Sequence, residues 1–362
     1  MIKRLKYILL VFPLLLLPFR SVAGEAAGSV SAEAVQGSQV DIKSMLFGHI
    51  GDSYQWHITR IGDKELTIPL PVIVCSKDSG WHCFLSSRLE DGPYEGFYIA
   101  EGGKYDGKIV EKDAAGTEVR PFDISITKNV LGLMINSAIL VVLILCCSRW
   151  YRRHDALKEA PSGVAALLEP VIEMIDDDVI KGSIPEDQSR KYAPYLLTVF
   201  FFILVNNLMG IIPIFPGGAN ITGNIAVTLV LALCTFLAVN LFANRYYWKD
   251  KFWPAVPWWL KVPVPLIPFT EVFGIFTKPF ALMIRLFANI MAGHAVILSF
   301  VCIIFITVEL GPLVNGTMTF IAVLFGIFMD FLELLVAFIQ AYVFTMLSAV
   351  FIGLAHEKPE AE

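Results

Sequence analysis

Two long apolar stretches near the carboxyl end constrain the fold of this chain more than any other feature. They cover about residues Leu266–Val308 and Met318–Leu354. Each is longer than the roughly 20 residues that an upright helix needs to cross a hydrocarbon core of roughly 30 Å. Of all residues, 56% are hydrophobic and 17% are charged, against roughly 45–50% and 25% in soluble domains. The sequence therefore predicts an integral membrane protein whose last two helices are either strongly tilted or broken.

Three shorter apolar segments precede these stretches, at about Val130–Cys147, Tyr195–Ile214 and Ile225–Ala243. Basic residues follow the first and third segments, whereas the connections at 214–224 and 309–317 have none. Because lysine and arginine gather in cytoplasmic loops, we expect five membrane spans, an exported amino terminus and a cytoplasmic tail at 357–362. The predicted fold class is an all-α polytopic protein of the bacterial inner membrane, with its membrane domain at 129–356.

The first 23 residues have the pattern of a secretory signal peptide. Three basic residues precede an apolar run at Tyr7–Phe19, and Ser21 and Ala23 are small residues at a suitable cleavage position. A retained first membrane helix is the alternative. We favour cleavage because the run is shorter than a span and contains two prolines. Cleavage independently places the segment that follows on the exported side.

Residues 24–128 have the composition of a soluble segment. Short runs rich in aromatic and β-branched residues, such as Trp56–Arg60 and Phe97–Ile99, alternate with glycine, aspartate and proline. This pattern predicts a small β-rich exported segment. Cys75 and Cys83 both lie in it, and export permits a disulfide between them. The sequence does not define their geometry, so the bridge stays an open alternative.

Residues 162–181 are predicted to form an amphipathic helix on the cytoplasmic side. Apolar residues recur at helical spacing between positions 164 and 179, and five acidic residues are interleaved with them. Anionic lipid would repel such an acidic face. We therefore expect the helix to pack against a partner protein or against the chain's own helices, rather than simply to bind lipid.

A few charged residues interrupt the last two apolar stretches, and they carry the main functional signal. A charge in the middle of a bilayer costs about 2.5–3.5 kcal/mol on insertion scales, so such residues usually face protein or water and serve a function. For those nearest the cytoplasmic end, snorkelling or mutual pairing is the alternative. The charged residues between Leu266 and Ala355 are Glu271 and Lys278 at that end, Arg285, Glu309 in an exported turn, Asp330 and Glu333, with one histidine, His294.

Helical spacing separates a fixed charge from a titratable group on the first of these stretches. Lys278, Arg285 and Asn289 share one face, and His294 projects about 180° away, at roughly 100° per residue. Arginine keeps its proton under all accessible conditions, whereas histidine exchanges protons near neutral pH. For His294 alone, a hydrogen bond between helices is the alternative interpretation.

The last stretch carries a matching set of polar residues. Glu333 and Gln340 are seven residues apart and share a face, and Asp330 lies about 60° from Glu333 around the helix. Polar groups on two adjacent helices indicate a proton path between them, because carboxylates and imidazole pass protons near neutral pH.

The segment from Arg285 to His294, RLFANIMAGH, resembles the signature of subunit a of rotary F-type ATP synthases, the stator channel of the membrane sector. Glu271 stands fourteen residues before the arginine, as in that family. Further matches are Lys278-Pro279, NLMGIIP at 207–213 and QAYVF at 340–344. The resemblance covers about residues 130–356 in the same order. The exported segment is a departure, because the amino terminus of the family is usually short.

The resemblance implies roles for these residues. Arg285 corresponds to the essential cation that faces the carboxylate of the rotating c-ring. His294 and Glu333 correspond to a pair that lines the half-channel on the exported side; the two residue types are exchanged relative to the best-studied bacterial form, as in the mitochondrial type. The other implied members of the proton path are Asn289, Gln340 and Asp330 near this pair, and Glu271 and Lys278 towards the cytoplasm.

The resemblance also implies partners: the c-ring, b-type peripheral-stalk subunits and the F1 sector, with surrounding lipid and H⁺, or Na⁺, as the ion. We expect no cofactor and no metal, and a chain that is not an enzyme by itself, because it has no phosphate loop and no nucleophile constellation. The net charge of −5 gives no basic footprint for nucleic acid. Two alternatives remain: a stand-alone proton-coupled transporter or channel, and an exported binding module formed by residues 24–128.

Overall fold

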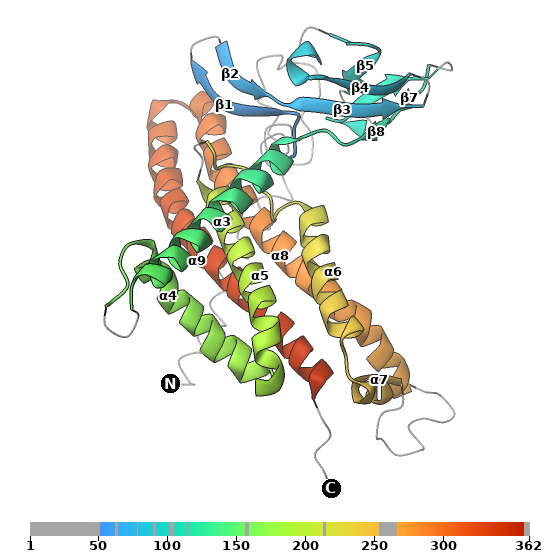
Figure 1. Cartoon of the computed structure of the whole chain (residues 1–362). Helices are drawn as coiled ribbons and strands as arrows, with labels where there is room; N and C mark the ends of the chain where they lie inside the picture. Colours follow the sequence, from blue (N-terminus) through green and yellow to red (C-terminus); the bar gives the residue numbers. More distant parts are fainter. Residues whose placement is uncertain are drawn as a thin grey trace. The chain divides into compact units, whose positions relative to one another are not determined.

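The computed structural model describes residues 51–357, apart from 62–63, 78, 90–91, 101–104, 114–115, 156–158, 213–214 and 253–265. The predicted signal peptide at 1–23 and residues 358–362 of the predicted tail lie outside this part of the chain. All the described residues belong to one compact unit, 42–362. Short strands are followed by long helices (Figure 1). A mostly helical fold with a β segment before it confirms the predicted class at this level.

The β segment consists of three small antiparallel sheets in the described residues. Alternate residues of its central strand are fully buried, namely Val72 and Val74, and they form a core with Tyr54, Phe97 and Ile109. The sheets are β1 (Gln55–Ile61) with β2 (Lys64–Pro69); β4 (Gly80–Leu85), β3 (Pro71–Ser76) and β8 (Phe122–Asp123); and β5 (Phe97–Ile99), β6 (Ile109–Lys112) and β7 (Glu118–Val119).

Cys75 and Cys83, for which the sequence left a disulfide open, are free thiols in the structure. The strand register gives the reason, since Cys75 pairs with Trp81 and Cys83 pairs with Ile73. The two cysteines therefore stand diagonally on neighbouring strands. Diagonal Cα atoms are about 7–8 Å apart, beyond the roughly 4.4–6.8 Å that a disulfide spans. The bridge is not formed at this register.

The helices follow the strands in chain order. Four of them are long and apolar enough to cross a membrane, and α6 with α7, bent by 100°, would make a fifth, among the described residues searched. The elements are α3 (Lys128–Arg153), α4 (Val164–Met174), the π-helix η3 (Ile175–Lys181), α5 (Glu186–Ile211), α6 (Ile225–Leu241), α7 (Arg245–Phe252), α8 (Leu266–Ile306), the 3₁₀ turn η5 (Thr307–Leu310) and α9 (Pro312–His356). The four helices that qualify by themselves are α3, α5, α8 with η5, and α9.

The last two helices are unbroken, with 41 residues in α8 and 45 in α9. Pro279 lies inside α8 without ending it. The turn between the two helices needs Gly311, whose φ of 97° is a conformation that favours glycine, and Pro312 then begins α9 with a φ suited to a first helical turn. The sequence predicted that these two helices are either strongly tilted or broken. The structure excludes the broken form, because both helices are continuous.

Helix α9 packs along both α5 and α8 (Figure 1). Its side towards α5 and α6 carries polar contacts as well as apolar ones. The amide of Asn207 on α5 donates to the backbone oxygen of Ala337 at 3.2 Å. The hydroxyl oxygens of Tyr195, Thr235 and Ser348 form a chain with separations of 3.0 and 3.2 Å that joins α5, α6 and α9. These contacts fix how α9 is rotated about its axis, and hence which of its residues face α8.

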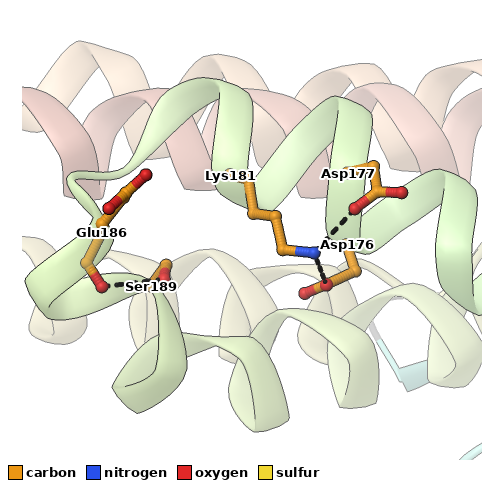
Figure 2. A network of polar contacts seen from close by, with 5 residues as sticks. All are labelled: Asp176, Asp177, Lys181, Glu186 and Ser189. Carbon is orange, nitrogen blue, oxygen red and sulfur yellow. Dashed lines mark hydrogen bonds and ion pairs between the residues drawn. The ribbon is translucent and has the colours of Figure 1, made fainter.

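Helices α4 and η3 occupy the segment for which the sequence predicts an amphipathic helix. The apolar side, including Ile175, Val179 and Ile180, is fully buried in the core that α5 and α9 share, so the segment packs against the chain's own helices. Lys181 on the outer side reaches Asp176 and Asp177 at 2.6 and 2.7 Å (Figure 2). These two contacts raise the pKa of Lys181 above its ordinary value.

Candidate functional site

His294 on α8 and Glu333 on α9 face each other across the interface of the two helices. The distance from His294 Nδ1 to Glu333 Oε1 is 3.1 Å, and the exposed fractions of their side chains are 18% and 4%. Glu333 Oε1 accepts no hydrogen bond from any described residue. A nearly buried carboxylate oxygen with capacity to spare, next to an imidazole, is an arrangement through which a proton can pass.

A glycine makes room for this carboxylate. A Cβ atom on Gly293 would lie 3.1 Å from Glu333 Oε1 and 3.4 Å from Glu333 Cδ. Such contacts are tighter than ordinary van der Waals packing, so any side chain at position 293 would push the carboxylate away from its place. The approach of Glu333 to the backbone of α8 therefore depends on Gly293, the residue before His294.

A cavity of about 330 Å³ lies beside the pair, between α8 and α9. Its polar lining is Asn289 on α8 with Glu333 and Gln340 on α9, and the rest of its wall is mostly apolar. Gln340 is buried, as is Glu333. The structure thus brings four of the residues that the sequence indicated, these three and His294, into one place. A few convergent polar groups in an otherwise apolar pocket are the usual lining of a binding site.

Arg285 stands apart from this pair on the outer surface of α8. Its side chain is exposed, and no carboxylate among the described residues pairs with it. Asn289, one turn later, is exposed as well. Because an arginine cannot lose its charge, a cation on a membrane-spanning helix needs a partner or water that the described residues do not supply.

Asp330 lies on the exposed side of α9 and does not line the cavity. It precedes Glu333 by three residues, yet only Glu333 turns towards α8. The sequence placed the two about 60° apart, and the packing of α9 separates them into a buried and an exposed position.

At the other end of α8, Glu271 forms an ion pair that the sequence did not indicate. Lys251 Nζ on α7 lies 2.5 Å from Glu271 Oε2, and the lysine side chain is 13% exposed. Lys278 instead places its Nζ 5.3 Å from the centroid of the Phe351 ring on α9. Pairing between Glu271 and Lys278, the alternative raised from the sequence, is therefore not what the structure has. The only sequence signal for Lys251 was its place in a basic loop.

Three buried asparagines form a second polar group, of which the sequence analysis included only Asn207, as the first residue of the NLMGIIP match. Asn136 on α3 donates to Asn206 on α5 at 3.1 Å, and Asn207 follows directly. The side-chain oxygens of Asn136 and Asn207 have no hydrogen-bond partner among the described residues. Their sequence signal was an amide inside an apolar span, which is costly unless it is bonded to protein or water.

The comparisons with known proteins divide the chain in the same way as its composition. The family described as ATP synthase A chain matches residues 134–353. Residues 45–127 match a family described only as a domain of unknown function.

Curated relatives match about two thirds of the chain. ATP synthase subunit a 2 of Prosthecochloris aestuarii is 43% identical over 250 residues, which cover 67% of this chain and 72% of the relative. The protein of the same name from Chlorobium luteolum is 47% identical over 251 residues, 66% of this chain and 68% of the relative. ATP synthase subunit a of Myxococcus xanthus is 38% identical over 256 residues, 66% and 79% of the two chains.

Proposed function

The chain belongs to the ATP synthase A chain family, and from that membership we propose how its residues move protons. It is a proton-translocating subunit of the membrane sector of an F-type ATP synthase. A stand-alone transporter is not favoured, because the family match spans nearly the whole helical part. Membership of the family implies a complex with a c-ring and other subunits. We propose that the b-type stalk and the F1 sector are among these, and that this chain binds no nucleotide itself.

His294 and Glu333 form the inlet from the exported side. Their 3.1 Å separation brings the imidazole and the carboxylate within reach of proton transfer once the ring of His294 turns to direct its N–H at Oε1. Asn289 and Gln340 orient water in the adjoining cavity, and Asp330 attracts cations on the exposed side of α9. From this inlet the proton passes to a carboxylate of the rotating ring, and the ring carries it round.

Arg285 separates the inlet from the outlet. A permanent positive charge repels a proton that would cross directly, and it pairs briefly with each ring carboxylate that has given up its proton. The exposed guanidinium on α8 pairs with no carboxylate of the described residues, and this supports the role because a ring carboxylate can approach it from outside the helix. Glu271 and Lys278 form the outlet towards the cytoplasm. Each charge that crosses 100 mV releases about 2.3 kcal/mol, so one ATP needs several protons.

The membrane arrangement follows from the same premises. We propose that the 23-residue signal peptide is cleaved, that residues 24–128 are exported, that five spans cross the inner membrane and that the tail is cytoplasmic. A helix of 41 residues is about 60 Å long, so crossing a core of roughly 30 Å implies a tilt of roughly 60°. Helices α8 and α9 then run obliquely along the ring, with H⁺, or Na⁺, as the ion.

The observation that carries this proposal is the His294–Glu333 pair between α8 and α9, together with an exposed Arg285 on α8 that pairs with no carboxylate among the described residues. The test uses the whole complex in membrane vesicles. Arg285→Ala should abolish proton-driven ATP synthesis while the c-ring still co-purifies, because the barrier between the two paths is lost. Arg149→Ala, which removes an exposed arginine at the end of α3, should keep the normal rate. A normal rate in Arg285→Ala, or a complex without a c-ring, would overturn the proposal.

A further inference from the structure

The β segment contacts the helical part through a buried tryptophan. Trp56 lies on β1, and only 2% of its surface is exposed. It forms a small core with Ala219 and Ile221, which are also buried and belong to the connection between α5 and α6. Its ring is 5.2 Å from that of Phe215 in an edge-to-face contact. Ile68 of the paired strand β2 packs against the same core, so Trp56 joins its own sheet to a loop of the membrane helices.

The contact is close enough to restrict the residues around it. A Cβ atom on Gly132 of α3 would lie 2.8 Å from Ala219 Cβ and 3.6 Å from Trp56. Helix α3, the α5–α6 connection and β1 therefore meet at one point without spare space. Substituting Gly132 would separate them, because no Cβ atom fits at 2.8 Å.

Two hydrogen bonds from backbone N–H groups of α3 hold the start of the β segment beside this point. Asp52 accepts a hydrogen bond from the backbone N–H of Asn129 at 3.1 Å. The backbone oxygen of Ser53 accepts a hydrogen bond from the backbone N–H of Lys128 at 2.9 Å. These bonds satisfy N–H groups of the first helical turn, which have no partner within the helix. The hydrogen bonds to α3 and the packing on the α5–α6 connection thus both hold Trp56 in place.

The loop that Trp56 covers leads directly to His294. Asn220 contacts Met291 Sδ on α8 at 3.6 Å, three residues before His294. A Cβ atom on Gly210 would lie 3.6 Å from the Ala219 oxygen and 3.8 Å from His294 Nε2. Residues 219 and 220 therefore lie between Trp56 on one side and the turn of α8 that carries His294 on the other.

We propose that the exported β segment forms the outer wall of the proton inlet, with Trp56 as the residue that positions the α5–α6 connection over His294. The proposal rests on the proposed function of His294 as the inlet group. On this proposal, residues 45–127 take part in proton delivery. Shortening Trp56 would leave a cavity into which the loop relaxes, and this movement would carry Ala219 away from Gly210 and His294.

The test compares two tryptophans of the same segment in the whole complex. Trp56→Ala should raise, by roughly threefold or more, the proton concentration on the exported side at which ATP synthesis is half-maximal. The reason is that displacing a delivery path by a fraction of an ångström slows proton delivery. The maximal rate and the dependence on cytoplasmic pH should stay as in the unmodified complex. Trp81→Ala is the matched control, since Trp81 is 63% exposed and contacts Phe122 of its own sheet. It should change nothing.

Trp56→Phe should restore most of the response, because a smaller ring still fills part of the site. Rates are expressed per c-ring, so that a loss of assembly is separated from slower delivery. The proposal is wrong if Trp56→Ala behaves like Trp81→Ala, or if it lowers the maximal rate and both pH responses together. Arg285→Ala in the same preparation tests the proposed function separately: an active Arg285→Ala complex overturns that function, whereas a silent Trp56→Ala overturns only the outer wall.

Discussion

His294 Nδ1 and Glu333 Oε1 lie 3.1 Å apart, although 39 residues and a glycine turn separate the two side chains along the sequence. Three features make this contact. Gly311 reverses the chain, Gly293 leaves space for the carboxylate, and the polar contacts of α9 with α5 and α6 set its rotation. The contact between His294 and Glu333 therefore depends on how the helices pack. It should tolerate exchange of the two residue types better than the loss of either one.

Exchanging the two residues tests whether the pair acts as a unit. Each single variant, His294→Glu or Glu333→His, should lower proton-driven ATP synthesis by at least about tenfold, because a proton-transfer group contributes about 10²–10⁴-fold. The double variant keeps one imidazole and one carboxylate and should recover most of that loss. Glu309→Gln, at an exposed position, should leave the rate unchanged. A double variant no better than the two losses combined would contradict the prediction.

Gly293→Ala tests the space beside Glu333. A misplacement of about 1 Å costs up to about 100-fold, so a shift of a few tenths of an ångström predicts a loss of roughly threefold. Gly274→Ala is the matched control on the same helix, because a Cβ atom there would meet nothing within 4 Å. Both changes favour the helix equally, so a difference in ATP synthesis between them reports the contact with Glu333. Equal rates would show that the carboxylate moves aside freely.

The Lys251–Glu271 pair is expected to be sensitive to the sign of its charges. Lys251→Glu should lower ATP-driven proton pumping, because two carboxylates would then face each other at the end of α8. Adding Glu271→Lys reverses the pair and should restore pumping to within a few fold. Lys249→Glu changes an exposed neighbour on the same helix and serves as the control. Failure of the reversed pair to improve on Lys251→Glu would argue against the contact.

The β segment should lose stability at alkaline pH through Tyr54. Burial, together with the hydrogen bond to Asp123 at 2.6 Å, raises the pKa of Tyr54 above its ordinary value. A raised folded-state pKa means that the stabilisation is complete below the unfolded-state pKa of about 10 and is lost as the pH rises from there.

Limited proteolysis of the β segment in the intact complex measures this dependence. The unmodified chain should be cut faster above pH of about 10, whereas Tyr54→Phe, which has no proton to lose, should be cut at a rate that stays flat over the same range. Tyr54→Phe should also be slightly less stable at neutral pH, by about 1 kcal/mol, because the hydrogen bond to Asp123 is gone. Identical alkaline profiles would assign the effect to another group.

Hydropathy predicted the four helices of the described residues that are long and apolar enough to cross a membrane, because a membrane leaves the backbone little choice other than a helix; the fifth predicted span corresponds to α6, which qualifies only together with α7. Hydropathy could not distinguish a tilted helix from a broken one, which depends on whether Pro279 interrupts α8; it does not. Helical spacing brought Glu333 and Gln340 to one face, as the cavity confirms. The same spacing could not separate Asp330 from Glu333, because the rotation of α9 depends on contacts with α5 and α6.

Contacts between segments that are far apart along the chain could not be predicted from the sequence. Lys251 reaches Glu271 only because the chain bends by 100° between α6 and α7, and no periodicity encodes that bend. Trp56 packs on Ala219, more than 160 residues away. The free Cys75 and Cys83 likewise depend on a strand register that two cysteines in a sequence do not define.

An unbroken α8 ties position along the chain to position in the plane of the membrane. At a tilt of roughly 60°, each residue advances about 1.3 Å sideways and only about 0.75 Å in depth. The nine residues from Arg285 to His294 then amount to a lateral offset of about 12 Å and a depth difference of about 7 Å. On the proposed roles of the two residues, a proton at His294 would lie farther from the Arg285 barrier along the membrane plane than in depth. Its transfer past the barrier would then need a carrier that moves within that plane.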